Sequence, residues 1–241
     1  MSLPVAILAG GLATRLRPVT TTIPKALVEI DGTPFAELQA ELLARQHISR
    51  IVWLVGYRGE QIEAALGDGS RWGMRFEYLY DGPKLLGTGG AIKRAVGQLG
   101  DAFFVMYGDS YLECDFAAIE AAFVSSGRTA LMTVFRNDGQ FDGSNIEFAN
   151  GRIVVYDKRA RTPAMHHIDY GLGVFSAQAF RKYPDDGIVD LATVYQDLLA
   201  RDELAAFEVG SRFYEIGSPE GLASTERHVR DRRRSSGQRS G

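Results

Sequence analysis

The stretch of sequence that decides the fold is Val5–Lys25, which reads VAILAGGLATRLRPVTTTIPK. Its first four residues form a short apolar run, which is typical of a buried strand in a parallel sheet. Gly10 and Gly11 follow, and glycines allow the backbone to turn sharply and to approach a ligand closely. Arg15 and Lys25 add two positive charges. Such a loop suits a polyphosphate, although an ordinary strand-to-loop turn can carry the same glycines.

Apolar runs and amphipathic segments alternate through the rest of the first half of the chain. The pattern predicts strands at 5–8, 51–55, 75–80 and 103–107, and helices at 34–46, 60–66 and 89–96. Repeated strand–helix units predict an α/β fold with a doubly wound, mostly parallel sheet. Ligands of such sheets bind at the carboxyl ends of the strands, where both the glycine loop and Asp109 fall.

The second half of the chain has a different pattern, which predicts a small antiparallel portion. Strands are expected at 130–136, 144–148, 152–157, 171–176, 207–209 and 213–216, with a turn at Asn150-Gly151 and helices at 191–201 and 219–231. His166 and His167 lack metal-ligand spacing and are expected in a loop. We predict a single domain over residues 1–231, followed by a basic, Ser/Gly-rich and disordered tail at 232–241.

Composition narrows the class of protein. The chain has 241 residues and a formal net charge of −3, which argues against broad nucleic-acid binding. The single cysteine, Cys114, excludes an internal disulfide framework, fits a reducing compartment and is expected to be a core thiol. A secretory signal and a membrane-length run of about 20 apolar residues are both absent from the sequence. The prediction is a cytoplasmic protein that contacts neither nucleic acid nor membrane.

The opening motif resembles the signature of the sugar-1-phosphate nucleotidylyltransferases, also called nucleotide-sugar pyrophosphorylases. That signature is Gly-Gly-x-Gly-Thr-Arg-Leu-x-Pro-x-Thr followed by Pro-Lys-x-Leu, and Ala13 replaces its last loop glycine here. The resemblance extends over residues 5–229 and implies a Rossmann-like fold. It also implies nucleotide binding by Leu8, Ala9, Gly10 and Gly11, phosphate binding by Arg15, and a catalytic role for Arg15 and for Lys25 at the α-phosphate.

A second glycine-rich string, LGTGGA at residues 86–91, resembles the base-recognition loop of the family. The extended string GTGGAI is similar to that of the heptose-1-phosphate guanylyltransferase branch. The resemblance places Asp81, Gly87, Thr88 and Gly89 at the nucleotide base. A carboxylate at Asp81 accepts an N–H from guanine or from the imide of uracil or thymine, which favours GTP, UTP or dTTP as donor.

Two carboxylates are expected to hold Mg²⁺. Asp109 ends an apolar strand at the ligand edge of the predicted sheet, and Mg²⁺ prefers oxygen ligands. In the resembled family the matching Gly-Asp holds Mg²⁺ against the α-phosphate of the nucleotide. Its usual partner is an aspartate in a late motif, and the matching string YEIGSPE at residues 214–220 supplies Glu215 instead. The second metal ligand is therefore one methylene longer than the family norm.

The resemblance also places Gly143, Lys158 and Asp169 at the sugar phosphate. The implied substrates are an NTP and a sugar 1-phosphate, and the implied products are an NDP-sugar and pyrophosphate. Two alternatives stay open on the sequence. One is a cytidylyltransferase acting on a phospho-alcohol, and the other is a catalytically silent sensor of nucleotide sugars.

Overall fold

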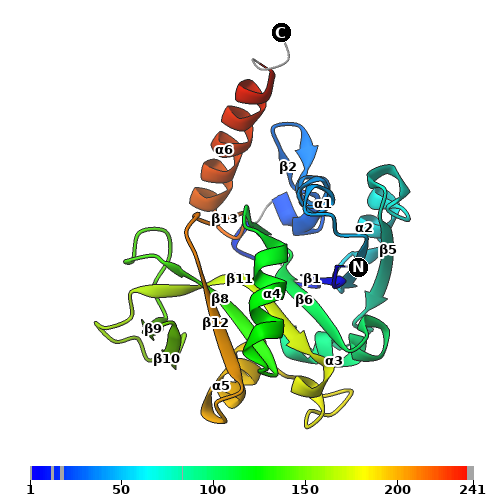
Figure 1. Ribbon diagram of the computed structural model, residues 1–241. Helices are drawn as coiled ribbons and strands as arrows, with labels where there is room; N and C mark the ends of the chain where they lie inside the picture. Colours follow the sequence, from blue (N-terminus) through cyan, green and yellow to red (C-terminus); the bar gives the residue numbers. More distant parts are fainter. Residues whose placement is uncertain (1, 12–13, 17–18, 83, 238–241) are drawn as a thin grey trace.

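The expected first strand, β1 (Val5–Ala9), lies in the middle of the sheet in this computed structural model (Figure 1). It pairs in parallel with β4 (Arg50–Val55) on one side and with β6 (Ala102–Tyr107) on the other. Strand β5 (Arg75–Tyr80) continues the parallel set beyond β4. The chain thus winds outward from β1 to β5 and crosses back to β6, so the loops after β1 and β6 flank the switch point of the sheet. The structure describes residues 2–11, 14–16, 19–82 and 84–237, and Ala13 lies outside them.

Helices cover both faces of the sheet. Val5 and Ile7 belong to one apolar core and Ala6 to the other, because successive strand residues point to opposite faces. Helices α1 (Phe35–Arg45) and α4 (Phe116–Ser126) bury Phe35, Leu42, Phe116 and Ile119 in the first core. Helices α3 (Gly87–Leu99) and α5 (Leu191–Ala200) bury Ile92 and Leu198 in the second. These two layers confirm the doubly wound α/β fold.

The antiparallel portion is also confirmed. Strand β11 (His167–Ser176) pairs antiparallel with β6 and with β8 (Ala130–Arg136), and β12 (Leu204–Val209) extends the sheet beyond β8 in parallel. Strands β9 (Ile146–Ala149) and β10 (Arg152–Tyr156) form the expected hairpin. Its two turn residues have positive φ angles of 52° at Asn150 and 75° at Gly151, as a tight hairpin turn requires.

His167 corrects one expectation from the sequence. It was predicted in a loop with His166, but it is the first residue of β11 and is buried. Its Nε2 lies 3.1 Å from Glu208 Oε1 on β12, and its ring packs against Phe148 with 4.8 Å between ring centroids. Two adjacent polar residues carry no strand periodicity, so the sequence pattern alone did not reveal the start of this strand.

The last helix is longer than the sequence predicts. Helix α6 runs over Pro219–Gly237, so residues 232–237 are helical where a disordered tail was expected, and 238–241 lie outside the described residues. Arg233 explains the extension, because its Nη1 lies 3.0 Å from Asp31 Oδ2 and its Nη2 donates to Thr33 Oγ1 at 2.7 Å. These contacts tie α6 to the hairpin of β2 (Glu29–Ile30) and β3 (Thr33–Pro34).

The remaining elements are short. One strand pair joins β7 (Ser110–Tyr111) to β13 (Tyr214–Glu215). The others are α2 (Gly59–Leu66) and the 3-10 turns Thr14–Leu16, Val19–Thr21, Lys25–Leu27, Ser70–Trp72 and Ala177–Phe180.

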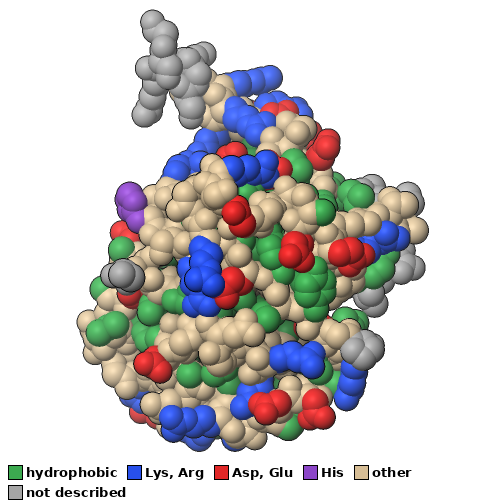
Figure 2. Space-filling model, turned by 90° about the vertical axis from the view of Figure 1, so that its right-hand side faces the viewer, with side chains coloured by type: hydrophobic (Ala, Val, Ile, Leu, Met, Phe, Trp, Pro, Cys, Tyr) green, Lys and Arg blue, Asp and Glu red, His purple; other side chains and the backbone are tan. Residues whose placement is uncertain are grey.

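Charged side chains of both signs are interspersed on the face of the molecule that Figure 2 shows. This mixture agrees with the small net charge of the chain. Among the described helices, none combines the length and the apolar composition that a membrane span requires. Cys114 packs at the margin of the first core, and burial raises the pKa of its thiol to about 12, which disfavours the reactive thiolate.

Candidate active site

A cavity of about 270 Å³ opens at the carboxyl ends of β1 and β6. Residues of the opening motif, of the LGTGGA string and of the Gly108-Asp109 pair meet there. The cavity is lined by nine of the predicted site residues: Leu8, Ala9, Gly10, Gly11, Lys25, Asp81, Gly87, Thr88 and Asp109. The switch point of the sheet therefore brings together residues that lie up to about a hundred positions apart in the chain.

Close packing explains the glycine at position 10. A Cβ atom added there would lie 2.9 Å from Asp81 Oδ2 and 3.3 Å from the backbone nitrogen of Gly56. The loop after β1 can approach Asp81 this closely because Gly10 has no side chain. The Asp81 side chain follows β5 and is 8% exposed. Burial raises the pKa of this carboxyl above its ordinary value, and the Arg94 guanidinium opposes the rise.

The amino end of α3 is held by the segment that precedes α5. The Val189 carbonyl accepts the N–H of Gly89 at 2.8 Å and that of Gly90 at 3.1 Å. Thr88 Oγ1 accepts the N–H of Leu191 at 2.8 Å. The N–H of Gly89 is thus used within the chain, and Gly89 does not line the cavity as Gly87 and Thr88 do.

Asp109 and Glu215 are brought together by the β7–β13 pair. Glu215 lies opposite Ser110, and the Ile216 N–H donates to the Asp109 carbonyl at 2.9 Å. Lys25 Nζ lies 2.7 Å from Asp109 Oδ2, so the charge of this carboxylate is compensated by the phosphate-loop lysine.

Gly217 marks the point where the charged groups converge. A Cβ atom added to this glycine would lie 2.8 Å from Glu215 Oε2, 3.1 Å from Asp109 Oδ2 and 3.4 Å from Arg15 Nη2. Both carboxylates and the Arg15 guanidinium therefore border one small space beside the cavity.

The longer side chain of Glu215 is accommodated by its neighbours. Its Oε1 accepts the Ser218 hydroxyl at 2.7 Å, and its Oε2 accepts the Gly217 N–H. A Cβ atom at Gly221 would overlap with Glu215 Oε1, so the glycine in the first turn of α6 leaves room for the extra methylene. The carboxylate thereby holds Ser218, whose Oγ accepts the Gly221 N–H at 3.0 Å and caps α6, and it lies near the amino end of this helix, where negative charge is stabilised.

The two carboxylates fit a magnesium ion. Mg²⁺ retains several waters and is commonly bound through one or two carboxylates together with substrate phosphates. Within the part of the chain that the structure describes, no cluster of three or more His, Cys, Asp or Glu side chains is arranged around one metal position. Two carboxylates that face one space are a donor set that Mg²⁺ can use together with waters and substrate phosphates.

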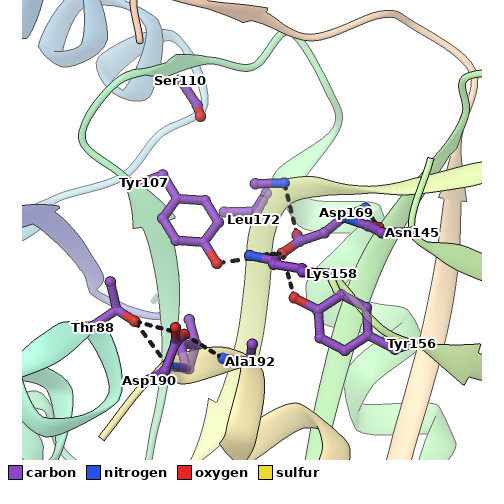
Figure 3. A network of polar contacts seen from close by, with 12 residues as sticks. Thr88, Tyr107, Ser110, Asn145, Tyr156, Lys158, Asp169, Leu172, Asp190 and Ala192 are labelled. Carbon is purple, nitrogen blue, oxygen red and sulfur yellow. Dashed lines mark hydrogen bonds and ion pairs between the residues drawn. The ribbon is translucent and has the colours of Figure 1, made fainter. Parts of the chain in front are cut away.

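Lys158 and Asp169 form a second polar centre next to the cavity (Figure 3). Lys158 Nζ lies 3.8 Å from Asp169 Oδ2, and this side chain of Asp169 is 4% exposed. Tyr107 and Tyr156 direct their hydroxyls at the same oxygen, at 3.3 and 3.4 Å. Gly143 lies on the adjacent loop beneath the guanidinium of Arg161, which occupies the space that a Cβ atom would take.

Sequence reasoning identified Lys158 and Asp169 but missed both tyrosines. Each tyrosine lies close in the sequence to a predicted site residue. Tyr107 directly precedes Gly108-Asp109, and Tyr156 lies two residues before Lys158. The pairing of β11 with β6, and its link through β9 to β10, was needed to show that both tyrosines lie on strands beside Asp169.

The chain is similar in sequence to known nucleotidyltransferases. A family model described as nucleotidyl transferase matches residues 5–141. The chain is 29% identical over 220 residues to a mannose-1-phosphate guanylyltransferase of Mycobacterium tuberculosis, covering 89% of this chain and 61% of that protein. It is 33% identical over 114 residues to a D-glycero-alpha-D-manno-heptose 1-phosphate guanylyltransferase of Campylobacter jejuni, covering 47% of this chain and 51% of that protein.

The solved structures include HddC from Yersinia pseudotuberculosis, with a TM-score of 0.79 and 27% identity over 94% of this chain and 99% of that chain. The same protein has been solved in complex with GMP-PN. The chain spans about half to three fifths of the length of the curated relatives it matches. Since the family model covers more than half of its residues, the chain belongs to the nucleotidyl transferase family.

Proposed function

We propose that this protein transfers a nucleotidyl group from an NTP to a sugar 1-phosphate and releases pyrophosphate. The observation that carries the proposal is the convergence of Lys25, Asp109 and Glu215 beside the cavity at the switch point of the sheet. Relatives named as sugar-1-phosphate guanylyl-, uridylyl- and thymidylyltransferases support the same class of reaction.

The proposed roles follow from charge and position. Arg15 and the loop N–H groups after β1 hold the β- and γ-phosphates, and Lys25 binds the α-phosphate. Lys158 binds the incoming phosphate of the sugar. One oxygen of that phosphate attacks the α-phosphorus in line with the departing pyrophosphate. Because this oxygen is already ionised at neutral pH, the reaction needs no general base, and catalysis consists of positioning and charge neutralisation.

Asp109 and Glu215 are the proposed ligands of Mg²⁺, which when bound neutralises developing charge on the phosphates. Lys25 then has two partners in turn. Without the divalent ion its ammonium neutralises Asp109 at 2.7 Å. A Mg²⁺ ion held by Asp109 would supply this compensating charge instead, which would leave the Lys25 ammonium available to the triphosphate.

The proposed donor is GTP, UTP or dTTP, because Asp81 presents a hydrogen-bond acceptor in the cavity. Guanine offers a ring N–H and an amino group, and uracil and thymine offer an imide N–H. A buried carboxylate strongly favours bases that carry such N–H groups, because leaving the carboxylate without a hydrogen-bond partner costs free energy.

Replacing Asp81 by asparagine is expected to weaken nucleotide binding and to stabilise the fold. The amide nitrogen would face the N–H donors of the base, so the KM for the NTP should rise roughly tenfold or more. The free energy of unfolding should increase at neutral pH, because burial raises the folded pKa of Asp81 and penalises its charged form. This gain in the free energy of unfolding should shrink as the pH falls. Below the pKa that Asp81 has in the unfolded chain, its carboxyl is neutral in both the folded and the unfolded state.

Denaturant unfolding between pH 4 and pH 8 and steady-state kinetics check both effects. Asp186→Asn, at an exposed position in the loop before α5, is the matched control and should change neither quantity. An Asp81→Asn protein with an unchanged KM for every NTP would remove Asp81 from base recognition.

Pyrophosphate release with a panel of NTPs and sugar 1-phosphates tests the proposed function. We expect turnover with at least one purine or pyrimidine donor that carries a ring N–H, and its loss on adding excess chelator. Turnover restricted to CTP and a phospho-alcohol would replace the proposal by the cytidylyltransferase alternative. Nucleotide-sugar binding without any turnover would identify a sensor.

A further inference from the structure

Tyr107 occupies the boundary between the two polar centres. It is the last residue of β6, it lines the nucleotide cavity, and it immediately precedes Gly108 and the carboxylate of Asp109. Its hydroxyl points toward Asp169, as Figure 3 shows. One side chain thus borders the cavity with its ring and reaches the Lys158 centre with its hydroxyl.

The Asp169 carboxylate is enclosed by partners from several elements. Its Oδ2 accepts the Tyr107 hydroxyl at 3.3 Å and the Tyr156 hydroxyl at 3.4 Å, and its Oδ1 accepts the Gly171 N–H at 3.1 Å. Its own backbone N–H donates to Asn145 Oδ1 at 3.2 Å. A carboxylate this well buried and bonded is fixed in place and makes a stationary counter-charge.

Lys158 is positioned by three groups of this network. Its Nζ lies 3.8 Å from Asp169 Oδ2, 5.5 Å from the centre of the Tyr107 ring and 5.9 Å from the centre of the Tyr156 ring. Contacts of an ammonium with aromatic rings at this range are attractive. Lysine is a flexible side chain whose freedom opposes binding, and the network removes part of that freedom before a ligand arrives.

We propose that Tyr107 is a positioning residue for the sugar-phosphate acceptor: its hydroxyl orients Asp169, and its ring and Asp169 together hold Lys158 where the acceptor phosphate binds. This inference rests on the proposed function. It also assigns Asp169 a different task from the one its sequence motif suggests. With its side chain 4% exposed, Asp169 acts through Lys158 rather than by binding the sugar phosphate itself.

The test is the Tyr107→Phe variant, which keeps the ring and removes the hydroxyl. The KM for the sugar 1-phosphate should rise about tenfold, as expected for one hydrogen bond to a charged group, while the KM for the NTP stays within about twofold. Tyr195→Phe is the matched control. The Tyr195 ring is buried next to Tyr156, with 5.9 Å between the ring centroids. Among the residues that the structure describes, the Tyr195 hydroxyl makes no hydrogen bond to Asp169.

A double-mutant cycle distinguishes positioning from a general structural role. If Tyr107 acts through Lys158, Tyr107→Phe should add little to the defect of Lys158→Ala, whereas independent structural effects would add. Asp169→Asn provides a second route to the same answer and should also raise the KM for the acceptor. An unchanged acceptor KM in Tyr107→Phe, or full additivity with Lys158→Ala, overturns the inference.

The proposed function and the inference fail in different ways. An inactive parent protein refutes the function, and calorimetric titration with inorganic phosphate then decides the inference without turnover. The loss of phosphate affinity in Lys158→Ala measures the contribution of Lys158. Tyr107→Phe should show a smaller loss of phosphate affinity than Lys158→Ala. Equal phosphate affinity in the parent and in Tyr107→Phe overturns the positioning role, even if the parent protein is inactive.

Discussion

Replacing Lys25 by alanine is expected to lower kcat/KM by roughly 100-fold or more, the effect of losing one preorganised electrostatic contact in a transition state. The variant loses the proposed α-phosphate contact, and it also leaves Asp109 without the ammonium that lies 2.7 Å away. Metal binding should therefore not weaken, because Lys25 no longer competes for Asp109. The measurement is pyrophosphate release at saturating Mg²⁺, with unfolding curves to confirm the fold.

Lys93→Ala is a matched control for this experiment. Lys93 forms a 3.2 Å ion pair with Asp185, and its side chain is 17% exposed against 20% for Lys25. It lies outside the residues that line the cavity. We expect this variant to keep its activity. Near-normal turnover in a folded Lys25→Ala protein would contradict the phosphate-loop assignment.

Replacing Glu215 by glutamine is expected to lower activity roughly 100-fold at low millimolar Mg²⁺, because a neutral amide is a weak ligand for a hard cation. The amide oxygen can still accept the Ser218 hydroxyl, so the cap of α6 is largely preserved and the protein should fold. Glu215→Asp should retain partial activity with a preference shifted toward Mn²⁺, because Mg²⁺ demands stricter geometry.

Activity as a function of Mg²⁺ and Mn²⁺ concentration measures this effect. Both Glu215 variants should need more metal for half-maximal activity than the parent protein. The control is Glu220→Gln, an exposed glutamate in the first turn of the same helix. A Glu215→Gln protein with the metal dependence of the parent would leave Glu215 with no role beyond holding Ser218, the cap of α6.

The parallel strands of the first half of the fold were predictable because β1, β4 and β6 are short apolar runs and β5 alternates between apolar and polar residues. Helix α4 was not predicted. Its sequence FAAIEAAFVSS is apolar on nearly every side, so a helical period hardly shows, and its clearest signal is the Asp115 cap, whose carboxylate accepts the Ala118 N–H at 2.9 Å. Apolar periodicity identifies amphipathic elements and fails for elements that are apolar all round.

The site was predictable as a set of motifs but not as a geometry. The positions of Asp109 and Glu215 followed from strings that resemble a family, and their proximity follows from the β7–β13 pair. Strand β13 falls within the strand expected at 213–216, but the two-residue β7 and its pairing with β13 leave no pattern in the sequence. The contact of Glu215 with the capping residue Ser218 depends on the absence of a side chain at Gly221. Such facts depend on tertiary contacts, so no local property of the sequence contains them.

The pairing of β7 with β13 has a consequence for biosynthesis. A chain that has been translated past Asp109 but not yet as far as Glu215 contains only one of the two carboxylates. Ser110–Tyr111 then lack their strand partner. At about 5–20 residues per second, translation needs roughly 5–20 seconds to cover the intervening segment. During that interval the central parallel strands can already pair around β1. A nascent chain therefore contains all the residues that line the cavity before it acquires the second carboxylate of the proposed metal site, late in translation.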